Sequence, residues 1–133
     1  MTGGKPIAIV VDDNAIIRMD ACSILEDAGY DAHEAGDADE AVATIRRLDG
    51  LVDVLFTDVD MPGSSMDGFA LARFAAKHWP HLALVVCSGR VKPGPDDLPK
   101  SAEFIGKPFS AEIIQDKLRQ LLPQERLPPP LKD

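Results

Sequence analysis

The sequence predicts one α/β domain built around a mostly parallel sheet. Short apolar runs alternate five times with longer stretches of helical periodicity. Strands that alternate with helices in this way are joined by right-handed crossover connections, which make neighbouring strands parallel. The length of 133 residues corresponds to a single domain, whose core is large enough to fold without disulfides or structural metal ions.

The strands are predicted from apolar runs of suitable length. The first, residues 7–11, is wholly apolar, as is typical of a strand buried on both faces. The second has the weakest pattern and is predicted mainly from its position between two helical stretches. The four further strands are expected at residues 31–35, 52–57, 82–87 and 102–105.

The helices are predicted from apolar residues at helical spacing and from the residues that begin or end them. Gly29 and Gly50 follow the first two helices, and Pro80 follows the third. Ser110 is a preferred N-cap residue for the last helix. The helices are expected at residues 14–28, 37–48, 67–78 and 111–122.

The interval between the fourth and fifth strands breaks the alternation. It contains three prolines and two glycines. Each proline lacks a backbone donor and clashes with the preceding helical turn. We therefore expect a loop with one turn near residues 96–98, so that the fourth helix of a regular alternation is shortened or missing.

The domain is predicted to span residues 5–122, and residues 123–133 form a proline-rich C-terminal tail. Four of these last residues are proline, so we expect the tail to be extended or disordered. Nothing in the sequence indicates an internal repeat, a linker or an output domain, and we expect a chain that acts alone.

The composition excludes several classes of protein. A net charge of −8 provides no basic surface for nucleic acid and disfavours anionic membranes. No apolar run approaches the roughly 20 residues that cross a bilayer, and the N-terminus lacks the pattern of a signal peptide. Cys22 and Cys87 are far apart and form no CxxC motif. We therefore expect a reduced, soluble, cytoplasmic protein.

Polar residues follow the carboxyl ends of four of the predicted strands, which is where parallel sheets bind ligands. Singly, each residue could be a helix cap or a turn residue. Together, so many like charges at one edge would repel one another and raise one another's pKa. The residues are Asp12, Asp13, Asp58, Asp60, Ser88 and Lys107.

Such an acidic cluster implies a bound cation. Oxygen ligands alone favour Mg²⁺, which uses one or two carboxylates together with waters or phosphate oxygens. Lys107 would then suit a phosphoryl oxygen, and aspartate is an established phosphoryl acceptor.

Four motifs in this order resemble the receiver domain of bacterial two-component response regulators. They are VVDDN at residues 10–14, TDVDMP at 57–62 with MDG at 66–68, SG at 88–89 and KPF at 107–109. The resemblance covers about residues 5–122. It implies a flavodoxin-like fold, with a doubly wound five-stranded parallel sheet of order 2-1-3-4-5.

The resemblance also implies a function and a cofactor. Asp58 would accept a phosphoryl group from a phosphohistidine on a sensor histidine kinase or a histidine phosphotransfer protein. Asp13 and Asp58 would bind Mg²⁺ directly, with the main-chain carbonyl of Asp60 as a third ligand, and Asp12 would act through a water molecule. Beyond its own phosphorylation and dephosphorylation, such a protein is not an enzyme.

Three further positions match residues with roles in the family. Lys107 would form an ion pair with a phosphoryl oxygen, and the proline after it suggests a cis peptide bond. Ser88 would bond another phosphoryl oxygen. Phe104 stands where the family carries an aromatic switch residue, although a structural role as an apolar core residue of the strand explains a phenylalanine there equally well.

Other surface residues are predicted to influence the reaction. Asp60 and Arg90 lie two positions after Asp58 and Ser88, and we expect them to overhang the site and affect the attack of water on the acyl phosphate. The first helix carries a candidate docking patch for the kinase, although its periodicity also places one member in the core. The patch consists of Ile16, Ile17 and Met19.

One departure from the family and two alternatives bear on this interpretation. The missing fourth helix puts the family's common output and dimer surface in doubt. A haloacid-dehalogenase-like phosphatase would also carry a pair such as Asp58 and Asp60, but its nucleophile follows the first core strand, where this chain has Asp12 and Asp13. A receiver fold that only binds partners remains as an alternative, against which the complete acidic set argues.

Overall fold

The computed structural model describes residues 5–132 and contains one parallel five-stranded sheet of order β2-β1-β3-β4-β5. This is the predicted strand order, and all five predicted strands are present. Residues 1–4, to which the signal-peptide prediction applies, lie outside the described residues. The strands are β1 (Ile7–Val11), β2 (Asp31–Ala35), β3 (Val54–Asp58), β4 (Ala83–Ser88) and β5 (Ala102–Gly106).

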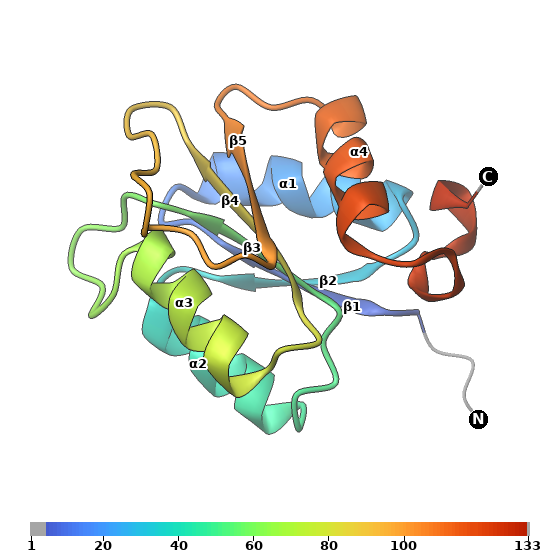
Figure 1. The fold of residues 1–133 in the computed structure, drawn as a ribbon, viewed down its shortest axis with the longest axis horizontal. Helices are drawn as coiled ribbons and strands as arrows, with labels where there is room; N and C mark the ends of the chain where they lie inside the picture. The colour runs from blue at the N-terminus through green and yellow to red at the C-terminus, as the bar shows by residue number, and fades with distance from the viewer. Residues whose placement is uncertain (1–4, 133) are drawn as a thin grey trace.

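In the described part of the chain, four α-helices cover the two faces of the sheet, two on each side (Figure 1). One pair of helices packs against one face, and the other pair packs against the opposite face, as in a doubly wound sheet. Within residues 5–132, no helix is long and apolar enough to cross a membrane. The first pair is α1 (Ala15–Asp27) and α4 (Ala111–Leu121), and the second is α2 (Ala38–Arg47) and α3 (Gly68–His78).

Each of the four helices begins at a side chain that accepts a hydrogen bond from a backbone N–H of the first turn. Such caps satisfy donors that have no partner inside the helix. They explain why the helix starts could be predicted closely. The capping residues are Asn14, Asp37, Asp67 and Ser110.

The apolar strands supply both halves of the core because alternate side chains point to opposite faces. On β1, Val10 belongs to the cluster beneath α1 and α4, whereas Ile9 belongs to the cluster beneath α2 and α3. Phe56 and Leu55 divide in the same way on β3. Continuous apolar runs are therefore required on the central strands.

The segment between β4 and β5 contains no helix, as predicted. Residues 89–101 are all described, and they form a loop with a turn at residues 95–97. Arg73 on α3 donates a hydrogen bond to the carbonyl of Asp97 at 2.9 Å. Leu98 packs against the same small apolar cluster as Phe104 on β5. The loop therefore covers part of the surface that a helix would otherwise protect.

The prediction of an extended or disordered C-terminal tail was wrong. Two short 3-10 helices, Gln124–Arg126 and Pro129–Leu131, follow α4. Leu127 and Leu131 are 3% and 1% exposed and belong to the core cluster beneath α1 and α4. Residue 133 lies outside the described residues.

Apolar burial of leucines and polar contacts of arginines both hold this C-terminal segment against the rest of the domain. Leu127 and Leu131, which flank three consecutive prolines, gain by burying apolar surface. Arg119 donates a hydrogen bond to the carbonyl of Leu131 at 3.1 Å, and Arg126 forms an ion pair with Asp53 at 3.2 Å. A proline-rich composition cannot reveal such contacts, because they depend on a surface formed by distant parts of the chain.

Candidate functional site

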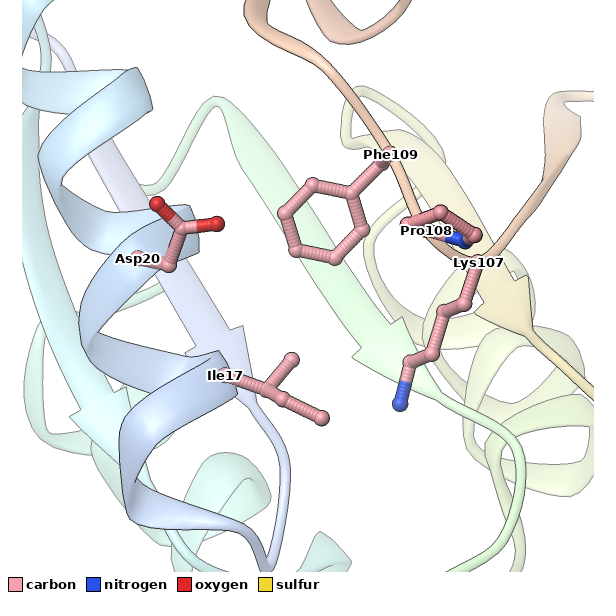
Figure 2. A pocket seen from close by; sticks show the side chains of 5 residues that line it. All are labelled: Ile17, Asp20, Lys107, Pro108 and Phe109. Atoms are coloured by element: carbon pink, nitrogen blue, oxygen red, sulfur yellow. The ribbon is translucent and has the colours of Figure 1, made fainter.

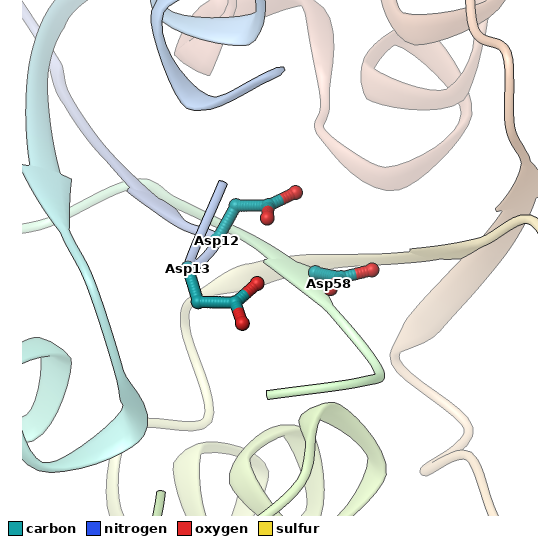
Figure 3. Close-up of side chains that lie close together, drawn as sticks. All are labelled: Asp12, Asp13 and Asp58. Carbon is teal, nitrogen blue, oxygen red and sulfur yellow. The ribbon is translucent and has the colours of Figure 1, made fainter. Parts of the chain in front are cut away.

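Three aspartates meet at the carboxyl edge of the sheet (Figure 3). The register pairs Val11 of β1 with Thr57 of β3, so the residues that follow them, Asp12 and Asp58, are neighbours. One carboxylate oxygen from each of Asp12, Asp13 and Asp58 lies within 4.8 Å of the others. Asp12 and Asp58 are buried, and Asp13 is exposed.

Lys107 brings an ammonium group to this cluster. Its Nζ lies 2.8 Å from Oδ1 of Asp58 and 3.1 Å from Oδ2 of Asp12. The register pairs Ser88 with Gly106, which places Lys107 directly beyond the end of β5. The peptide bond between Lys107 and Pro108 is cis, as expected from the sequence.

Two factors determine the electrostatics of the site: the burial of its charged groups and the excess of carboxylates over ammonium groups. Burial raises the pKa of the Asp58 carboxyl, and the nearby charge of Asp12 raises it further, although the hydrogen bond from Lys107 lowers it. Burial disfavours the Lys107 ammonium, but its hydrogen bonds to Asp58 and Asp12 outweigh this effect and raise its pKa. Three carboxylates thus face one ammonium, and the cluster favours an additional cation.

Hydrogen bonds hold Asp12 at each of its polar atoms. Its N–H donates to the carbonyl of Ala35 at 3.1 Å. Its Oδ1 accepts from the backbone N–H of Asn14 at 2.9 Å, and its Oδ2 accepts from Lys107. Its carbonyl oxygen accepts from Nη1 of Arg18 at 2.7 Å. The acidic loop is therefore fixed from β2, from α1 and from the end of β5.

Sequence reasoning missed Arg18. An arginine on an amphipathic helix is commonly a solvated residue, and no motif distinguishes it. The available signal was positional. Arg18 lies one helical turn after the cap residue Asn14, and this N-terminal end of α1 lies beside the aspartates.

Ser88 lies buried at the end of β4. Its Oγ accepts hydrogen bonds from the backbone N–H groups of Arg90 and Val91, at 3.1 and 2.9 Å. Its carbonyl accepts from the N–H of Lys107 at 3.1 Å. The hydroxyl therefore fixes the beginning of the loop between β4 and β5.

Phe104 lies on β5, behind the site, and is half-buried. It is paired in register with Val86 and packs against an apolar cluster that includes Val59 and Phe69. Val59 directly follows Asp58 in the chain. The structure thus gives Phe104 a core contact and places it close to the loop after the candidate phosphoryl acceptor.

The start of α3 lies against the backbone of Asp58. A Cβ atom at Gly68 would lie 2.0 Å from the carbonyl oxygen of Asp58, and the Gly68 N–H donates to the carbonyl of Val59 at 3.0 Å. Only glycine permits this approach. The glycine of the MDG motif is thereby explained by packing.

Asp60 and Arg90 are exposed and line a hollow of about 250 Å³ that also includes the three aspartates and Lys107. The structure therefore brings these two residues to the rim of the site, as expected. They reach it from two different loops.

A second hollow, of about 320 Å³, adjoins the site (Figure 2). Ile17 and Asp20 of α1 face Lys107, Pro108 and Phe109, which follow β5. Next to it, two further side chains of α1 extend into solvent, with exposed fractions of 80% and 61%. They are Ile16 and Met19.

Comparison with known proteins identifies the same family that the sequence motifs resemble. Residues 8–119 match the model of the response regulator receiver domain. The chain belongs to this family. Receiver domains are signalling modules rather than conventional enzymes, and the acidic cluster lies at the place where they bind Mg²⁺.

Curated relatives share this domain within much longer proteins. The chain is 31% identical over 125 residues to the sensor kinase CckA of Brucella abortus, covering 92% of this chain and 13% of CckA. It is 35% identical over 111 residues to the nitrogen assimilation regulatory protein NtrX of Azorhizobium caulinodans, covering 80% of this chain and 24% of NtrX.

Solved structures agree with the fold. The receiver domain of the hybrid histidine kinase CckA superposes with a TM-score of 0.73 at 26% identity, covering 88% of this chain and 99% of that domain.

Proposed function

We propose that this chain is a phosphoacceptor receiver in a two-component phosphorelay, in which Asp58 takes a phosphoryl group from a phosphohistidine of a partner. The observation that carries the proposal is the convergence of Lys107, Asp12 and Asp13 on the buried carboxylate of Asp58. A structural ion pair would need only one of these carboxylates. The arrangement instead supplies an acceptor, a cation for phosphoryl oxygens and ligands for a metal ion.

The donor set fits Mg²⁺, because it consists of oxygen atoms alone and lies at an open hollow. Asp13 and Asp58 would hold the ion directly, together with the main-chain carbonyl of Asp60, and Asp12 would hold it through water. When bound, the ion neutralises charge on the phosphoryl oxygens during transfer.

The residues of the chain perform the transfer by position and charge. A carboxylate oxygen of Asp58 forms the new bond to phosphorus while the bond from phosphorus to the histidine nitrogen breaks. Lys107, now 2.8 Å from Asp58, turns to pair with an oxygen of the transferred group. Little covalent chemistry is asked of the protein, since positioning and charge stabilisation dominate such reactions.

Ser88 and Phe104 would carry the change to the surface. The Ser88 hydroxyl, drawn to donate to a phosphoryl oxygen, would loosen its bonds to the N–H groups of Arg90 and Val91. The loop between β4 and β5 would then shift, and Phe104 would repack. Asp60 and Arg90, at the rim, would control the approach of water to the acyl phosphate.

The partner would be a sensor histidine kinase or a histidine phosphotransfer protein docked on α1. Ile16 and Met19 offer exposed apolar contacts next to the hollow that reaches Lys107. With a net charge of −8, direct DNA binding is not part of the proposal. We place the reaction in the cytoplasm, where free thiols such as Cys22 and Cys87 stay reduced.

Intact mass tests the function. The chain is incubated with acetyl phosphate, with and without Mg²⁺, beside the Asp58→Asn variant. We expect the mass of one phosphoryl group to be added to the unaltered chain, only with the metal, and not to the variant. No addition under any condition would contradict the proposal and favour a receiver that only binds partners, whereas continuous release of phosphate from varied esters would favour a phosphatase.

A further inference from the structure

The guanidinium of Arg18 joins the acidic loop to β2. Its Nη1 donates to the carbonyl oxygen of Asp12, and its Nε donates to Oε1 of Glu34, both at 2.7 Å. The Arg18 side chain is only 20% exposed. Short charge-assisted bonds of this kind, made through the fixed fork of a guanidinium, specify geometry as well as adding energy.

The carbonyl that Arg18 holds has a particular importance for the site. It belongs to the planar peptide unit between Asp12 and Asp13, so its orientation determines the direction in which Asp13 leaves the backbone. The exposed Asp13 carboxylate lies in the acidic cluster. The bonds to Asn14 and Lys107 hold the side chain of Asp12, but they do not orient this peptide unit.

We propose that Arg18 is a positioning residue for the metal site. By fixing the peptide unit between Asp12 and Asp13, it keeps the Asp13 carboxylate at the distance from Asp58 that binding of Mg²⁺ requires. The proposal rests on the function proposed above. Glu34 supports the arrangement by holding the other side of the same guanidinium.

A purely electrostatic role for Arg18 predicts the opposite effect. A positive charge close to a divalent cation repels it, so removing the guanidinium would strengthen binding of Mg²⁺. Loss of positioning would weaken it, because residues that orient metal ligands contribute about tenfold or more to metal affinity. The sign of the change therefore separates the two roles.

The experiment is a calorimetric titration of the full chain with Mg²⁺ alone, without a phosphodonor. We expect Arg18→Ala to bind Mg²⁺ about tenfold more weakly than the unaltered chain. We expect Arg18→Lys, which keeps the charge but cannot hold Asp12 and Glu34 together, to bind severalfold more weakly. The matched control is Arg47→Ala, an exposed arginine at the end of α2, which should leave the affinity unchanged.

Thermal unfolding without Mg²⁺ accompanies each titration. Unchanged or tighter binding by a folded Arg18→Ala would overturn the proposal, even if its melting temperature falls. If Arg18→Ala does not fold, unchanged affinity in Arg18→Lys would overturn it in the same way. Absence of Mg²⁺ binding by the unaltered chain would instead contradict the proposed function, and with it this role of Arg18.

Discussion

At the scale of single residues, the site places charges where they oppose folding. Asp58 is 5% exposed and lies beside Asp12 and Asp13. Its raised pKa means that the ionised carboxylate is less favourable in the folded chain than in the unfolded chain, in spite of Lys107. The site therefore costs stability, as functional sites often do.

Replacing this charge should stabilise the protein. We expect Asp58→Asn to increase the free energy of unfolding at pH 7 by about 1 kcal/mol, because the amide can still accept a bond from Lys107. The gain should grow as pH rises from the ordinary carboxyl pKa of about 3.9 to the raised pKa of Asp58, and be complete above it. Below the ordinary pKa it should vanish, because the carboxyl is neutral in both states. Urea unfolding at a series of pH values measures it, and a variant that is less stable at pH 7 would show that the ion pair with Lys107 dominates.

The residues of the site could be predicted largely because each follows a strand end. Asp12, Asp58 and Ser88 end or follow three apolar runs, and parallel register alone brings them to one edge. Arg18 could not be predicted, because its role depends on a contact with a backbone carbonyl. The contact of Ser88 with the N–H groups of the following loop likewise has no sequence signature.

At the scale of elements, the edge strand β2 and the loop after β4 show what local sequence does and does not determine. The polar segment Asp31–Ala35 forms a strand because it pairs with β1 over all five residues, so tertiary pairing overrides weak local preference. Prolines between β4 and β5 exclude a helix by their own geometry, and this absence could be predicted from composition alone.

The junction between β3 and α3 makes a prediction for Gly68. A methyl group there would overlap the carbonyl oxygen of Asp58, so either α3 or the end of β3 must move. We expect Gly68→Ala to destabilise the chain by roughly 2 kcal/mol and to reduce phosphorylation of Asp58. The control is Gly106→Ala, where nothing lies within 4 Å of the added atom; equal stability of the two variants would contradict the packing argument.

At the scale of the whole molecule, the carboxyl-end edge and the amino-end edge of the sheet have different roles. The carboxyl edge carries the acidic cluster, whereas the C-terminal segment covers the opposite edge. There it packs beside Gly29, which follows α1, and Arg126 bonds the carbonyl of His81, which precedes β4. Composition suggested a detached tail because proline-rich segments commonly lack burial, but Leu127 and Leu131 complete the core.

Because of this division, a substitution in the C-terminal segment should lower the stability of the fold without changing the affinity for Mg²⁺. Leu131 is 1% exposed within the cluster beneath α1 and α4, so Leu131→Ala should lower the free energy of unfolding by about 3 kcal/mol. Affinity for Mg²⁺ should stay unchanged while the chain is folded, since the segment lies at the edge remote from the aspartates. Urea unfolding and a magnesium titration measure the two quantities, with the exposed Lys132→Ala as control. An unaltered unfolding midpoint in Leu131→Ala would mean that the segment is not part of the core, and a weakened magnesium affinity would mean that the two edges are coupled through the sheet.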